Sequence, residues 1–174
     1  MKPQPTIQPG RATVARLIEI LESSRALHAE LLSSVRARRE AIRTANFAEL
    51  TRLERIEAEI AARLATQDLA RTNESAQLAV RLSLPAKASL GDISARLPEP
   101  ERARLDLVRS NLRAAIEEVA RETGVVRQAT ERLSAHMAGI MQAVNSALAH
   151  AKVYSRGGVI AMGPNVVSTL DIKS

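Results

Sequence analysis

The stretch from Leu105 to Ala151 decides the fold, and it reads LDLVRSN-LRAAIEE-VARETGV-VRQATER-LSAHMAG-IMQAVNS-ALAHA when it is divided every seven residues. The first residue of every block is aliphatic. Because a sustained seven-residue apolar repeat turns one face of an α-helix toward neighbouring helices, the stretch predicts a long helix in left-handed packing. A second row, four residues further along, is expected to complete the packed face with Arg109, Ile116, Thr123, Thr130, Met137, Val144 and Ala151.

This helix is expected to span residues 99–153. The prolines and acids of segment 98–101 suit a first helical turn, where proline lacks only an amide that has no helical partner and acids favour the positive dipole end. Gly124 permits a kink inside the helix. Glycines and a proline follow Tyr154, so residues 154–174 are predicted to form a flexible tail. Such a helix cannot bury its apolar face alone, and it needs other helices, a second copy or a partner.

Two further long helices are predicted before it. The first covers residues 13–44 and the second covers 46–84, where Asn46 and Glu49 form a helix-start signature whose side chains can each accept from an unpaired amide. The apolar pattern of the second helix fades across the polar segment 70–75, which leaves open whether one helix crosses it. The packing row of the first helix contains Val14, Leu17, Leu21, Ser24, His28, Leu31, Val35, Arg38 and Ile42.

A connection follows the second helix, because Pro85 disfavours helical structure in the residue before it. The connection is expected to hold one short helix over residues 90–97. Ser89 would precede this helix, and Asp92 would stand at its third position, where an acid can cap the helix start. The chain then enters the long final helix.

The composition agrees with a helical protein. The 174 residues include one Phe, one Tyr and no Trp, so aliphatic side chains must fill the core. We therefore predict an all-α fold: an elongated antiparallel helical bundle with coiled-coil-like packing, one domain over residues 13–153, and flexible residues 1–12. No cysteine is present, which excludes disulfides and thiolate metal sites. Neither a secretory leader nor an apolar run of about 18 residues occurs, so we expect a cytoplasmic protein without membrane insertion.

The net charge of +6 is spread along the chain. The only local basic cluster consists of Arg36, Arg38, Arg39 and Arg43, and acids alternate with arginines elsewhere. Interspersed charge of this kind is typical of solvated helix faces. A nucleic-acid groove would more often combine a basic stripe with stacking aromatic side chains. A basic nucleic-acid-associated helical protein is therefore a minor alternative, and we expect no nucleic-acid partner.

Residues that could support catalysis are scattered. His28, His136 and His150 lack the spacing of zinc-binding or di-iron helices, and no glycine-rich phosphate loop or nucleophile elbow occurs. The sequence therefore predicts a protein that is not an enzyme and that holds no metal or cofactor.

The apolar stripe of the final helix widens toward its end. Methionine is flexible and suits surfaces that accept variable helices. Two interpretations stay open at this point: this end is buried in the protein's own bundle, or it binds a partner helix. The widened stripe consists of Leu133, Met137, Ile140, Met141, Val144 and Leu148.

The layout resembles the FlgN-type flagellar export chaperones. The segment Asn46-Phe47-Ala48-Glu49-Leu50 is similar to the acidic-Leu opening of that family's second helix. The segment Tyr154-Ser155-Arg156-Gly157-Gly158 is similar to the Tyr-x-x-x-Gly ending of its long helix, and a loose tail ends at residues 168–174.

The resemblance implies a function and a binding surface. It implies a chaperone that covers the amphipathic terminal helices of hook-associated (hook–filament junction) proteins and presents them at the export gate. It places Leu133, Met137, Ile140, Met141, Val144 and Leu148 against this client, and it makes Tyr154 a candidate for client or gate contact. A generic coiled-coil scaffold or homo-oligomer, for example a homodimer, is the main alternative.

Overall fold

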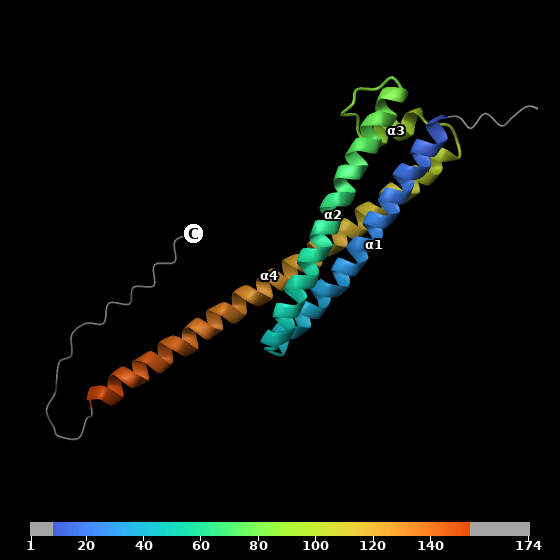
Figure 1. Ribbon diagram of the computed structural model, residues 1–174. Coiled ribbons are helices and arrows are strands. Elements are labelled where there is room, and N and C mark those ends of the chain that lie inside the picture. The colour runs from blue at the N-terminus through green and yellow to red at the C-terminus, as the bar shows by residue number, and fades with distance from the viewer. Residues whose placement is uncertain (1–8, 154–174) are drawn as a thin grey trace, which may run out of the picture. The chain divides into compact units, whose positions relative to one another are not determined.

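A computed structural model describes residues 9–153, and the side chains of residues 11–149 (Figure 1). It contains four helices: α1 (Pro9–Arg43), α2 (Phe47–Arg81), α3 (Leu90–Arg96) and α4 (Glu101–Val153). No strand occurs among the described residues, which confirms the predicted all-α helical bundle. The predictions made for the chain before residue 9, and for the tail with Tyr154, lie outside this range. The chain divides into two compact units between Thr130 and Glu131, and each is described by itself.

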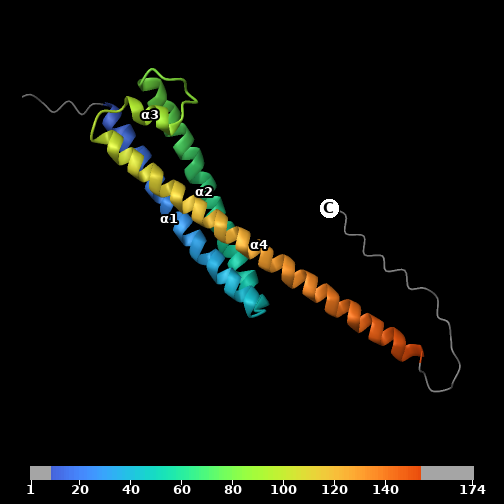
Figure 2. The same cartoon turned by 180° about the vertical axis from the view of Figure 1, so that it is seen from behind.

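The first unit contains α1, α2, α3 and the first part of α4. Both views show α1 and α2 running in opposite directions, while α4 starts at the end where α1 starts and lies beside it (Figures 1 and 2). Consecutive long helices are thus antiparallel, as predicted. The main core lies at the end of the unit that holds α3 and draws on all four helices. It consists of Val14, Leu17, Ile18, Leu21, Leu78, Ala79, Ile93, Leu97, Leu105 and Val108.

The packing row of α1 is confirmed, including its polar interruptions. Ser24 is buried, and its hydroxyl donates to the carbonyl oxygen of Ile20 at 2.9 Å. The Nδ1 atom of His28 lies 2.7 Å from the carbonyl oxygen of Ser24. The Arg38 guanidinium lies 3.0 Å from a carboxylate oxygen of Glu57 on α2. Ser24 and His28 therefore have partners within α1 and Arg38 pairs across to α2, although the Nε atom of Arg38 is buried without a hydrogen-bond partner.

The second helix crosses its polar segment without a break. α2 continues from Phe47 to Arg81, and Ser75 within the segment is buried at the helix interface. Between Ile60 and Ser75, however, no residue of α2 is fully buried. The fading apolar pattern therefore marks a stretch of helix with little packing rather than the end of a helix.

The packing face of α4 in the first unit differs from the predicted one. Leu105, Leu112, Val119 and Val126 are buried or partly buried, as expected. The companion row, however, lies three residues further along instead of four, and Arg109, Ile116, Thr123 and Thr130 are exposed. Partly buried alanines occupy two positions of the observed row, and a carboxylate that pairs with α1 occupies a third. The observed companion row is Val108, Ala115, Glu122 and Ala129.

The end of α1 is closed by a left-handed residue that is not glycine. Ala45 has a φ of 51°, and its amide donates to the carbonyl oxygen of Ile42 at 3.1 Å. The amide of Asn46 donates to Ala41 at 2.8 Å, which completes a Schellman motif. The side chain of Asn46 then caps α2, accepting from the amide of Glu49 at 3.1 Å. The reciprocal half of the predicted cap does not form, because the Glu49 carboxylate pairs with Arg52.

Replacing Ala45 with glycine is expected to stabilise the protein by about 1 kcal/mol, because the left-handed conformation costs an L-residue roughly that much. Ala62→Gly is the matched control: Ala62 is exposed within α2, and glycine there should lower the free energy of unfolding by about 1 kcal/mol. Thermal melts followed by circular dichroism should show Tm shifts of about 3 °C in opposite directions. Two shifts of the same sign would contradict the assignment.

The predicted short helix forms as α3 with a complete capping box. The hydroxyl of Ser89 accepts from the amide of Asp92 at 3.1 Å, and the Asp92 carboxylate accepts from the amide of Ser89 at 3.1 Å. Hydrogen bonds from the Ser89 hydroxyl and amide hold the pKa of the Asp92 carboxyl below its usual value. The buried hydroxyl of Ser94 donates to Asp106 at 2.8 Å, which fastens α3 to α4.

Candidate partner-binding surface

The described part of the second unit is the end of α4, and its apolar side chains are uncovered. Leu133 is partly exposed, and the exposed fractions of the other stripe residues run from 44% to 57%. By contrast, the apolar core residues of the first unit are at most 7% exposed. We call this surface the terminal stripe, and it consists of Leu133, Met137, Ile140, Met141, Val144 and Leu148.

The spacing of these residues brings them onto one face of the helix. Steps of three and four residues separate neighbours along the stripe, and residues so spaced share a face. Charge is sparse around it, because Glu131, Arg132 and His136 are the only charged or titratable residues between positions 131 and 149. A nearly uncharged apolar helix face of this width is typical of surfaces that bind a partner. The stripe side chains are exposed or partly exposed among the described residues, and their role in binding a partner helix stays a prediction.

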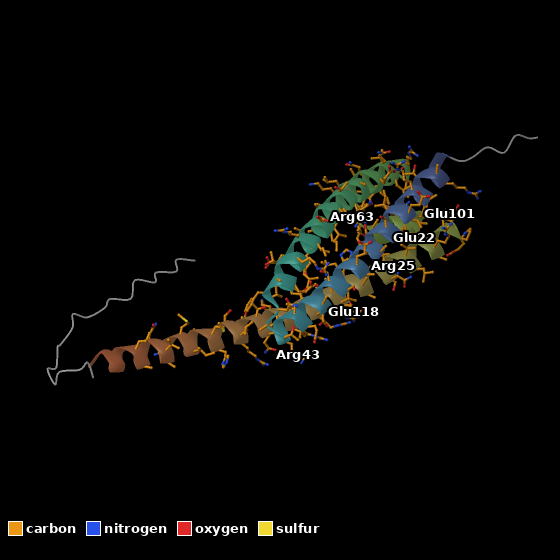
Figure 3. All side chains as sticks on the ribbon, turned by 60° about the horizontal axis from the view of Figure 1, so that its bottom comes forward. Glu22, Arg25, Arg43, Arg63, Glu101 and Glu118 are labelled. Carbon is orange, nitrogen blue, oxygen red and sulfur yellow. The ribbon has the colours of Figure 1, made fainter. Side chains whose placement is uncertain are left out.

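The arginines of the basic cluster of α1 form ion pairs with carboxylates of the same chain. Arg36 and Arg39 reach Glu118 and Glu122 on α4, each at 2.6 Å, and the second contact is an ion pair without hydrogen-bond alignment. Arg38 pairs with α2, as described above, and Arg43 pairs with Glu40 one turn earlier. Glu118 and Glu101, the partner of Arg11, lie beside α1 (Figure 3). Arg36, Arg38 and Arg39 thus join α1 to neighbouring helices, and all four charges of the cluster are balanced by protein carboxylates.

The hydrogen bond from the Arg43 side chain also lowers the pKa of the Glu40 carboxyl. The same effect, from Arg52, lowers the pKa of Glu49 at the start of α2. Both acids are at the exposed end of the α1–α2 hairpin. These shifts follow from surface ion pairs, so they indicate no catalytic carboxylate.

A groove in the first unit is a feature that the sequence did not predict. It has a volume of about 950 Å³ and lies between α1, α2 and the first part of α4. It follows from the poorly packed middle of α2, and the only sequence signal for it was the polar segment 70–75. We call it the bundle groove, and it is lined by Leu21, Ser24, His28, Leu64, Ala65, Asp68, Arg71, Leu90, Arg109, Ser110, Leu112, Arg113, Ile116 and Glu117.

Gly91 of α3 gives Arg109 its place in the bundle groove. A Cβ atom added at Gly91 would lie 2.7 Å from Nη1 of Arg109, which is closer than real side chains come.

Across the described residues, His, Asp and Glu side chains form no group of three that could hold a metal ion. None of the described helices is long and apolar enough to cross a membrane.

The fold and these surfaces define an all-α bundle protein that presents an uncovered apolar helix face. The sequence model of one family, described as FlgN protein, matches residues 13–161, which is most of the chain. The chain therefore belongs to the FlgN family of flagellar export chaperones. Comparisons with curated proteins and with solved structures gave no match.

Proposed function

We propose that this protein chaperones the amphipathic terminal helices of hook-associated proteins before their export. The observation that carries the proposal is the terminal stripe: a FlgN-family chain presents an apolar, nearly uncharged helix face with 44% to 57% exposure at five positions. An amphipathic client helix would lay its apolar face along this stripe, which removes both surfaces from water.

The work of the chaperone follows from this coverage. A client helix with a bare apolar face is prone to premature association in the cytoplasm. The bound chaperone would prevent that association, carry the client to the cytoplasmic domain of the export gate and remain behind when the client leaves. The exposed stripe supports binding without a preformed pocket, and methionines at two of its positions suit client helices of differing shape.

The direct test is binding between the purified full-length chain and purified hook-associated proteins of the same organism. Isothermal titration should give a saturable complex with a negative heat-capacity change, because apolar surface is buried. Client proteins without their terminal helices are the matched control, and they should not bind. Equal binding by the truncated clients would contradict the proposal.

A homodimer is the second candidate. The seven-residue spacing that joins Leu133 and Ile140 continues to Ala147, and such a row can pair with a second copy. Sedimentation equilibrium measures whether the chain forms dimers as its concentration rises. A dimer that forms through the stripe should compete with binding of the client. A monomer over the whole concentration range leaves the client as the occupant.

A further inference from the structure

The bundle groove has the dimensions of a short helix. Each wall contributes about two helical turns, roughly 11 Å at 1.5 Å per residue. These segments are 21–28 of α1, 64–71 of α2 and 109–117 of α4, and Leu90 of α3 adds to the lining. Three helices thus surround a space in which a fourth would complete a bundle.

The chemistry of the lining is amphipathic. Leu21 is fully buried, Leu64 and Leu112 are partly buried, and Ile116 is 45% exposed. Ile116 belongs to the row that the sequence predicted to pack, and it has no cover because the neighbouring row of α4 packs instead. Opposite it, the middle of α2 has no fully buried side chain. An apolar helix face seated here would cover both.

The charges of the groove differ between its walls. On the α2 wall, Arg71 holds Asp68 at 2.7 Å, so this edge is neutral. On the α4 wall, Arg109 and Arg113 stand one turn apart, and their carboxylate partners lie at longer distances of 3.3 Å and 3.5 Å. The ion pairs between helices elsewhere span 2.6 Å to 3.1 Å. The carboxylates of a bound helix can therefore replace the present partners of Arg109 and Arg113 on the α4 wall.

We propose that the bundle groove is a second docking site, which takes about two turns of an amphipathic helix with carboxylates one turn apart beside its apolar stripe. The carboxylates would meet Arg109 and Arg113 as charge-assisted hydrogen bonds, and the apolar face would cover Ile116. The proposal rests on the proposed function only for the source of this helix, which would be the exported partner. Its geometry stands on the first unit alone.

The test uses the full chain and two synthetic probes. Both are amphipathic peptides of about 18 residues, or five turns, with leucines at i, i+3, i+4 and i+7. The acidic peptide carries glutamates beside the leucine stripe, and the basic peptide carries lysines at the same positions. Fluorescence anisotropy measures the affinity of each. The acidic peptide should bind more tightly than the basic one.

Two variants locate the binding in the groove. Ile116→Asp should weaken the acidic peptide by about tenfold or more, because it places a charge under the apolar face. Arg113→Glu should weaken the acidic peptide by about fivefold and favour the basic peptide, because an exposed charge pair is replaced by a repulsive one. The Arg113 side chain is 82% exposed, so this variant keeps its fold. Arg121→Glu, on an exposed part of α4 outside the groove, is the control and should change neither affinity.

Other occupants give different results, and each would overturn the proposal. If Met137→Asp with Met141→Asp removes acidic-peptide binding and Ile116→Asp does not, the peptide sits on the terminal stripe. If a peptide of residues 154–174 displaces the acidic peptide at lower concentration than unlabelled acidic peptide does, the groove belongs to the chain's own tail. A dimer that Ile116→Asp dissociates would assign it to a second copy. Acidic-peptide binding that depends on Ile116, in a chain that binds no hook-associated protein, supports the groove and refutes the proposed function separately.

Discussion

Replacing Met137 and Met141 together with aspartate is expected to abolish binding of hook-associated proteins. The two side chains are 45% and 57% exposed and lie one turn apart at the centre of the terminal stripe. In a helix-in-groove interface they would be anchor positions, and a client helix docked over them would bury two carboxylates without partners. The loss should exceed a hundredfold in Kd, because each unpaired buried charge costs at least about 1.4 kcal/mol, or a factor of ten.

The fold should not change, because both methionines already face water. A thermal melt of the variant should match that of the natural chain within about 1 °C, as for ordinary surface substitutions. The matched control is Ala135→Asp with Gln142→Asp, which adds the same charge to the opposite, exposed face of the same helix. If the control also loses the client, charge rather than the stripe is responsible. A methionine variant that still binds normally would remove the stripe from the interface.

The sequence predicted the helices well because their signals are local. The row of α1, the cap formed by Asn46 and the capping box of Ser89 and Asp92 depend on residues within one or two turns of each other. The start of α1 was missed by four residues, since Pro9 begins the helix and no apolar residue marks its first turn. The exposed terminal stripe was also visible as a widened apolar face, although its uncovered state was not.

Contacts between helices could not be predicted from local sequence signals. The sequence favoured Ile116 as a packed residue because it is apolar, whereas Glu122 lies at the interface because Arg39 of α1 neutralises it. That pairing joins positions 83 residues apart along the chain and leaves no periodic trace. The bundle groove was missed for the same reason, because its lining comes from segments of α1, α2 and α4 that lie far apart in the sequence.

Leu105 lies in the same helix as the terminal stripe but belongs to the core, so a substitution there should change stability without changing binding. Its side chain is fully buried in the main core, so Leu105→Ala should lower the free energy of unfolding by about 2–5 kcal/mol through lost transfer energy and a cavity. Leu107→Ala is the matched control, because Leu107 lies two residues away in α4 and is 61% exposed. Its effect should stay within about 0.5 kcal/mol.

Urea unfolding followed by circular dichroism measures both variants, and the midpoint should fall only for Leu105→Ala. At a temperature where this variant stays folded, its terminal stripe is unchanged, so its affinity for hook-associated proteins should remain that of the natural chain. Ile140→Ala should behave in the opposite way: Ile140 occupies the same seven-residue row but is 44% exposed, so binding should weaken while the urea midpoint holds. Equal loss of stability at Leu105 and Ile140 would mean that the end of α4 is packed like its beginning. In that case the terminal stripe would be core, and the partner would have to bind elsewhere.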